Sequence, residues 1–163
     1  MSTIVIYKSD TGFTEKYGKW IGEALDCSTV KFNPKTGFDA SEYDTVIFGG
    51  NVFGGTINGW DAFKNANCFE GKKVFLYACG ATAMNQSEVI QRIKNTALTE
   101  EMQKSIEFYY FEGGINFEKM FFLFRWMLKL MAKGLAKKEN ATDEEIQMAE
   151  ALGKSHDSTN KIY

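Results

Sequence analysis

The sequence predicts an α/β fold, a doubly wound sheet of five parallel strands in the order 2-1-3-4-5 with helices on both faces. Two observations predict it. Short runs of β-branched and aromatic residues alternate along the chain with segments of helical spacing, which is typical of strand–helix–strand units. The runs are apolar at consecutive positions, as in strands that are covered on both faces. In such sheets a ligand binds outside the carboxyl ends of the strands, where the strand order reverses.

The predicted strands are apolar runs that end at glycines or at polar turn residues. The first is the β-branched run Ile4-Val5-Ile6 followed by Tyr7, and we expect it at the centre of the sheet. The third ends in the glycine pair Gly49-Gly50. The strands are predicted over residues 4–7, 28–32, 43–50, 73–78 and 106–111.

The predicted helices follow from helical spacing and from capping residues. Asn58 or Gly59 caps a helix that ends near residue 65, and capping boxes at Asn85, Thr99 and Thr142 open three more. The apolar side of the first helix is expected to consist of Phe13, Tyr17, Trp20, Ile21, Ala24 and Leu25. The main helices are predicted over residues 13–25, 59–65, 85–94, 117–138 and 142–152, with a short helix after residue 99.

The length of 163 residues predicts a single domain over residues 1–163, with a loosely held polar tail at about residues 153–163. The formal net charge is −2, from 19 basic and 21 acidic residues, so charge favours no nucleic-acid partner. The first residues leave no room for a signal peptide, and no apolar run is long enough to cross a bilayer, so we expect a cytoplasmic protein. Three scattered cysteines and one histidine, His156, fit a reducing compartment and predict no metal site.

A hydroxyl-rich turn, residues 9–14, follows the first strand and leads into the first helix. A helix N-terminus offers unpaired amide N–H groups and the positive end of a dipole, which together favour an anion. Ser9, Thr11 and Thr14 add hydroxyl donors, and Gly12 lets the backbone close around the ligand. The turn therefore predicts a phosphate site; the alternative is an ordinary strand–helix turn in which the hydroxyls only cap the helix.

This turn resembles the S/T-x-T-G-x-T phosphate loop of flavodoxins, which bind FMN. The resemblance implies that FMN is the cofactor and that the turn holds its phosphate. The residues implied are Ser9, Asp10, Thr11, Gly12, Phe13 and Thr14. It also implies a small redox protein that transfers electrons through the bound flavin and tunes it with hydrogen bonds and nearby charges.

Two further turns lie where the switch-point rule and the resemblance both place the flavin. The glycine-rich segment after the third strand is expected to contact the ring, with Phe53 as the one aromatic side chain well placed; the alternative is a mobile turn. The turn after the fourth strand is expected to contact the pyrimidine side of the ring. The residues implied are Asn51, Val52, Phe53, Gly54 and Gly55 in the first of these turns, and Cys79, Gly80 and Ala81 in the second.

The Gly-Gly turn after the fifth strand and the helix expected over residues 117–138 resemble the menaquinone-dependent protoporphyrinogen oxidase branch of the superfamily. That branch implies an FMN dehydrogenase that oxidises a tetrapyrrole and reduces a quinone. Here Phe124 precedes Arg125 where the branch often has Asp, and the long insertion near the third flavin turn is absent. Arg125, Lys129 and Lys133 form one basic stripe on this helix. The stripe is either the solvated side of a core helix or a peripheral contact for anionic lipid, a quinone pool or a carboxylated substrate.

The sequence thus favours an FMN-binding redox protein whose partner is another redox protein or a small-molecule or quinone substrate. An electron carrier and a protoporphyrinogen oxidase-like dehydrogenase both remain open, and no catalytic residue is identified. The alternative from another class is a non-redox signalling module such as a response-regulator receiver. A receiver requires an aspartate at the end of the third strand, where this chain has Gly49-Gly50-Asn51. A P-loop hydrolase is excluded because no Gly-Lys-Ser/Thr follows the first turn.

Overall fold

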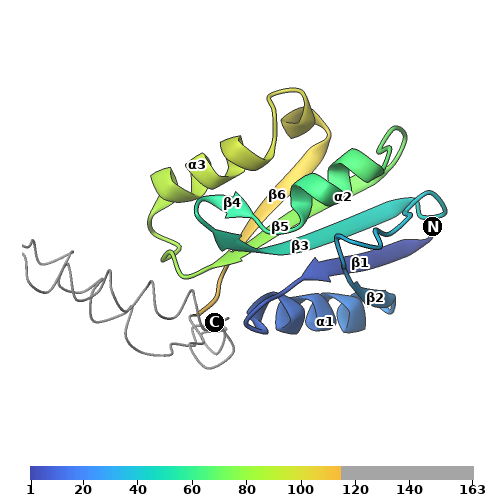
Figure 1. Ribbon diagram of the computed structural model, residues 1–163, viewed down its shortest axis with the longest axis horizontal. Helices are drawn as coiled ribbons and strands as arrows, with labels where there is room; N and C mark the ends of the chain where they lie inside the picture. Colours follow the sequence, from blue (N-terminus) through green and yellow to red (C-terminus); the bar gives the residue numbers. More distant parts are fainter. Residues whose placement is uncertain (115–163) are drawn as a thin grey trace, which may run out of the picture. The chain divides into compact units, whose positions relative to one another are not determined.

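The computed structural model describes residues 1–114, and its first compact unit is Met1–Gly113. This unit contains one sheet in the order β2-β1-β3-β5-β6, with the short strand β4 paired to β3 outside that path (Figure 1). All neighbours along the path are parallel, and β4 is antiparallel to β3. With β4 set aside, the order is the predicted 2-1-3-4-5, so the fold class is confirmed. The strands are β1 (Thr3–Lys8), β2 (Ser28–Lys31), β3 (Thr45–Phe53), β4 (Thr56–Ile57), β5 (Lys73–Gly80) and β6 (Ile106–Glu112).

Helices cover both faces of the sheet, with α1 on one face and α2 and α3 on the other (Figure 1). They are α1 (Phe13–Leu25), α2 (Trp60–Ala66) and α3 (Ser87–Ala97), followed by the 3₁₀ turn η1 (Met102–Lys104). The larger core lies under α2 and α3, where apolar side chains of the central strands meet aromatic rings of α2. This core includes Ile4, Ile6, Val46, Phe48, Trp60, Phe63, Val74, Leu76 and Ile93. Burial of these large side chains stabilises the sheet, and the sheet in turn positions the turns that follow the carboxyl ends of its strands.

The apolar side predicted for α1 is partly wrong. Ala24 and Leu25 are exposed and Trp20 is only half-buried, whereas Phe13 is buried and Tyr17 and Ile21 pack against the smaller core, as predicted. The helix instead approaches the sheet through glycines one turn apart, because a Cβ on Gly18 would lie 2.8 Å from the hydroxyl of Tyr77, and Gly22 is similarly enclosed. Close approach of the backbone at these glycines, together with the apolar side chains of Phe13, Tyr17 and Ile21, therefore sets the buried face. The buried residues of α1 are Phe13, Thr14, Gly18 and Gly22.

Two strands continue by two or more residues past their predicted carboxyl ends. β3 continues past Gly49 and Gly50 to Phe53, and β5 continues past Ala78 to Gly80. The glycine pair does not end β3, because both residues lie where a neighbouring side chain needs the space. A Cβ on Gly49 would lie 1.8 Å from Cζ of Tyr77, so glycine is required there by close packing within the sheet.

One of the predicted caps agrees with a helix start: Gly59, with a φ of 82°, is the N-cap of α2. The hydroxyl of Thr99 accepts the N–H of Met102 at 3.3 Å, but the N-cap of η1 is Glu101 rather than Thr99. The cap predicted at Asn85 is wrong, because α3 begins at Ser87 and its N-cap makes no side-chain hydrogen bond.

The helices predicted over residues 117–138 and 142–152, the polar tail and the basic stripe lie outside the described residues. A single domain over residues 1–163 stays a prediction. In the described part of the chain, no helix has both the length and the apolar character that crossing a membrane requires.

Candidate functional site

The sheet brings the three predicted turns to one edge, at the carboxyl ends of its central strands. Lys8 is paired with Gly50 between β1 and β3, and Asn51 is paired with Cys79 between β3 and β5. The carboxyl ends of β1 and β5 therefore lie beside the last residues of β3, and the segments that follow the three strands are neighbours. The predicted residues lie on this edge as Ser9, Asp10, Thr11, Gly12, Phe13 and Thr14 after β1, Asn51, Val52, Phe53, Gly54 and Gly55 at the end of β3, and Cys79, Gly80 and Ala81 at the end of β5.

The turn after β1 is shaped by its own hydroxyl and glycine. The buried hydroxyl of Ser9 accepts the N–H of Gly12 at 3.1 Å. Gly12 has a φ of 97°, a left-handed conformation that favours glycine, and it is the N-cap of α1. Among the described residues, no side chain caps this helix. The amide groups of Phe13, Thr14 and Glu15 precede the first hydrogen bond within the helix, from Lys16 to Gly12, and they point toward a position that suits an anion.

Thr14 carries the strongest sign of a ligand in this turn. Its side chain is 1 % exposed, and among residues 1–114 its Oγ1 is the one buried side-chain nitrogen or oxygen without a hydrogen-bond partner. A buried hydroxyl without a partner costs about 1–3 kcal/mol, so proteins rarely leave one. A group that accepts this hydroxyl at the N-terminus of α1 would remove that cost.

Tyr77, in β5, holds Thr14 in position through a hydrogen bond to its backbone. Its ring passes over Gly49 of the neighbouring strand, and its hydroxyl donates to the carbonyl oxygen of Thr14 at 3.0 Å. Burial raises the pKa of this phenol well above its usual range, so Tyr77 stays protonated and keeps its donor. The first turn of α1 is therefore held by a side chain of β5.

The segment predicted as a glycine-rich loop is a β-hairpin, which corrects the prediction. Asn51 to Phe53 belong to β3, and β4 returns antiparallel to them. Gly54 and Gly55 form the two-residue turn with φ values of 58° and 80°, the combination that two-residue hairpins require. Phe53 is 45 % exposed at the tip. The aromatic side chain of Phe53 and the exposed backbone of Gly54 and Gly55 thus lie at the carboxyl edge of the sheet.

Asp10 connects the first turn to this hairpin. Its carboxylate accepts from Nδ2 of Asn58 at 2.6 Å and from Nδ2 of Asn51 at 3.4 Å, and it pairs with Nζ of Lys8 at 2.8 Å. Asp10 therefore faces the hairpin rather than the first turn of α1.

In the third turn, only Ala81 of the three predicted residues lies beyond the strand. Cys79 and Gly80 are the last residues of β5. Cys79 is buried, and a Cβ built on Gly113 would lie only 2.6 Å from its Sγ atom. The backbone of this turn is held by Tyr110, whose hydroxyl donates to the carbonyl of Thr82 at 3.0 Å. Burial raises the pKa of Tyr110 to about 12.

Comparison with known proteins identifies the fold family. A family model described as Flavodoxin domain matches residues 4–143. The chain belongs to the flavodoxin domain family. No curated protein matches it.

Solved structures that resemble this flavodoxin domain are distant in sequence. A flavoprotein from Bacteroides uniformis is 17 % identical, with 68 % of this chain and 88 % of that chain covered and a TM-score of 0.47. A flavoprotein from Lactobacillus acidophilus, solved in complex with FMN, is 16 % identical, with 68 % and 91 % covered and a TM-score of 0.43. A flavodoxin from the domain Archaea is 11 % identical, with 94 % of both chains covered and a TM-score of 0.43.

Sequence reasoning misses three residues that hold the site of this flavodoxin domain. Tyr77 and Tyr110 lie in strands and donate to carbonyls of two different turns, and Asn58, expected only as a cap, binds Asp10. A signal for Tyr77 exists in the sequence, since a tyrosine inside an apolar strand needs both a partner for its hydroxyl and a small neighbour. Gly49 supplies the small neighbour, but only the register shows that the two residues are paired.

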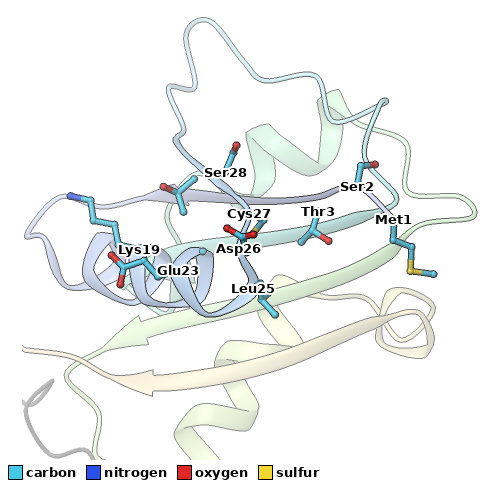
Figure 2. A pocket seen from close by; sticks show the side chains of 11 residues that line it. Met1, Ser2, Thr3, Lys19, Glu23, Leu25, Asp26, Cys27 and Ser28 are labelled. Atoms are coloured by element: carbon cyan, nitrogen blue, oxygen red, sulfur yellow. The ribbon is translucent and has the colours of Figure 1, made fainter.

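A separate hollow of about 650 Å³ lies at the opposite end of α1 (Figure 2). It is lined by the last turn of α1 and the first residues of β1 and β2, including Glu23, Cys27 and Thr29. It includes none of the predicted site residues. Because ligands of doubly wound sheets bind at the carboxyl ends of the strands, the carboxyl edge, rather than this hollow, is the candidate site of the flavodoxin domain.

Proposed function

We propose that this chain binds FMN at the carboxyl edge of its sheet and functions as a redox protein. The observation that carries the proposal is the buried hydroxyl of Thr14 at the N-terminus of α1, which has no hydrogen-bond partner among residues 1–114. Membership of the flavodoxin domain family supports it.

The residues present fit the phosphate of FMN. The first-turn amides of α1 and the positive end of the helix dipole favour a dianion. The hydroxyl of Thr14 would donate to a phosphate oxygen, and Thr11 would add a second hydroxyl from the turn. Ser9 has a different role, because its oxygen already accepts the N–H of Gly12 and so shapes the turn. No lysine or arginine lies within residues 9–14, so amides and hydroxyls would carry the binding.

The hairpin and the third turn fit the ring. Phe53 offers an aromatic face, Gly54 and Gly55 allow backbone amides to approach the polar edge closely, and Ala81 follows β5 beside them. When bound, FMN supplies one- and two-electron chemistry. The protein would orient the ring, exclude water from one of its faces and set the hydrogen bonds to its polar edge.

Within this function we propose electron transfer to a redox partner protein, with a protoporphyrinogen oxidase-like dehydrogenase and a quinone acceptor as the second candidate. The second candidate rests on the Gly-Gly turn and on the helix predicted over residues 117–138, where a peripheral membrane contact is also proposed. Gly113 is packed against Cys79 beside the third turn, so the Gly-Gly turn begins next to the proposed ring site.

The proposal is tested by comparing two ligands that differ only in the phosphate. Thr11→Ala with Thr14→Ala should weaken FMN binding by at least tenfold, because two hydrogen bonds to a charged group are lost, and should change riboflavin binding by less than about twofold. Thr29→Val, in β2 at the far edge, is the matched control and should change neither affinity. Equal loss of both ligands by a folded double variant would contradict the assignment of the turn to the phosphate.

The two candidates within this function differ in what reoxidises the reduced protein. Anaerobic assays with protoporphyrinogen and a menaquinone analogue test the dehydrogenase directly. Turnover that needs both compounds would favour the dehydrogenase. No turnover, together with rapid reduction and reoxidation by a one-electron dye, would favour the carrier.

A further inference from the structure

The carboxylate of Asp10 joins three elements at the candidate site. One of its oxygens accepts from Nδ2 of Asn58 at 2.6 Å and from Nδ2 of Asn51 at 3.4 Å, and the other pairs with Nζ of Lys8 at 2.8 Å. Asn58 also donates to Oδ1 of Asn51 at 3.3 Å, and its backbone N–H donates to the carbonyl of Asn51 at 2.9 Å. The network therefore links the turn after β1 to Asn51 in β3 and to Asn58, the residue that follows β4.

The hairpin needs such a link because it has little structure of its own. β4 has two residues, and within the described part of the chain nothing lies within 4 Å of a Cβ built on Gly54 or Gly55. An isolated hairpin of this size is marginally stable in water. Its base is anchored on the core side by Ile57, which is buried against Gly50. Asp10 supplies a second anchor, on the side that faces the phosphate turn.

We propose that Asp10 is a positioning residue that couples the two halves of the flavin site, so that an anion bound in the turn stabilises the ring-binding position of the hairpin. The inference rests on the proposed function. An anion at the N-terminus of α1 orders the turn that carries Asp10, and the ordered carboxylate holds Asn58 and Asn51. The coupling is reciprocal, because a ring held by the hairpin favours the same position of the turn.

A purely electrostatic role for Asp10 makes the opposite prediction. The carboxylate is a negative charge in the same turn as the proposed phosphate site, so it opposes a phosphate, and removing it should tighten FMN binding. The coupling role predicts weaker ring binding when either partner is removed. Asn58→Ala separates the two roles, because it breaks the 2.6 Å hydrogen bond and leaves the charge of Asp10 in place.

The experiment measures the affinity for riboflavin, by quenching of its fluorescence, with and without saturating inorganic phosphate at constant ionic strength. For the wild-type chain we expect phosphate to lower the riboflavin dissociation constant about fivefold, the lower end of typical coupling between sites. Asp10→Ala, Asn58→Ala and the double variant should each reduce this ratio to about one, with the double variant no worse than the single ones. Asp10→Asn keeps an acceptor oxygen and should retain part of the coupling. Glu23→Ala, which removes one negative charge at the far end of α1, should retain all of it.

A second measurement needs no flavin. Amide hydrogen exchange over residues 51–58 should be about fivefold faster in Asp10→Ala and Asn58→Ala than in the wild type or Glu23→Ala, because the hairpin loses an anchor. Equal exchange in all four proteins would overturn the anchoring role, even if a variant proved hard to load with flavin.

The outcomes separate this inference from the proposed function. Binding of riboflavin by the wild type without any effect of phosphate would overturn the coupling and leave flavin binding standing. Coupling that survives in both Asp10→Ala and Asn58→Ala would also overturn it, as would loss of coupling in Asp10→Asn with normal coupling in Asn58→Ala, since only the charge would then matter. A wild-type chain that binds no flavin would overturn both proposals.

Discussion

Replacing Thr14 by valine should raise the stability of the flavin-free protein and weaken its proposed binding of FMN. The two side chains have nearly the same shape, and both are β-branched, so the helix is little affected. What changes is one hydroxyl, which is buried at 1 % exposure and has no partner among the described residues.

The two effects follow from the same atom. Without ligand, valine removes a buried polar group that costs about 1–3 kcal/mol, so the free energy of unfolding should rise by about 1 kcal/mol or more. The melting temperature of a chain of this size should rise by about 3 °C for each of these kcal/mol. With FMN, valine removes a hydrogen bond to a charged phosphate worth about 1.5–3 kcal/mol, so the dissociation constant should rise about 10- to 150-fold.

Two assays check this prediction. Urea unfolding of the flavin-free protein gives the stability change, and fluorescence titrations with FMN and riboflavin give the two affinities. Riboflavin has no phosphate, so its affinity should change by less than about twofold. Thr29→Val serves as the control for a threonine away from the site. A Thr14→Val protein that is less stable and keeps the wild-type ratio of FMN to riboflavin affinity would refute the reasoning, because the hydroxyl would then have a partner within the protein.

Three further predictions concern the surroundings of the site. Because burial raises the pKa of Tyr110 to about 12 while an unfolded tyrosine titrates near 10, the unfolded state loses this proton first as the pH rises. The contribution of Tyr110 to stability is thus complete below pH 10 and should fall by about 1–2 kcal/mol between pH 10 and 12, a loss that Tyr110→Phe reduces and that denaturant unfolding measures. Gly49→Ala should destabilise the protein by about 3 kcal/mol and weaken FMN binding, since its Cβ would displace the Tyr77 ring, whereas Gly37→Ala, in open space, should cost about 1 kcal/mol. Cys68 is exposed and Cys79 is buried, so a thiol reagent followed by mass spectrometry should label Cys68 at once and Cys79 only after unfolding; fast labelling of Cys79 in the native protein would contradict its position.

The order of the sheet is predictable because each long strand is a separate apolar run and the intervening segments have helical spacing. The first turn is predictable for a local reason, since hydroxyls and a glycine between a strand and a helix have few other uses than capping or anion binding. The hairpin is not predictable from its glycines alone. Gly49 and Gly50 look like a strand end, but one makes room for Tyr77 and the other for Ile57, while Gly54 and Gly55 form the true turn.

Features that depend on contacts between segments far apart in the sequence could not be predicted either. The buried face of α1 is set by Gly18 and Gly22, because the distance between helix and sheet is decided by what lies opposite. The same holds for the hydrogen bonds from Tyr77 to Thr14 and from Asn58 to Asp10, which join residues far apart in the chain. Their partners can be chosen only after the register of the strands is known.

The proposed binding of FMN through its phosphate is tested most directly by two titrations of the flavin-free protein, one with FMN and one with riboflavin. Flavin fluorescence and visible absorbance monitor both titrations in the same buffer. We expect one FMN bound per chain, with an affinity at least about tenfold higher than that for riboflavin, because a phosphate at a helix N-terminus adds charge-assisted hydrogen bonds. Absence of FMN binding, or equal affinity for the two flavins, would contradict the claim.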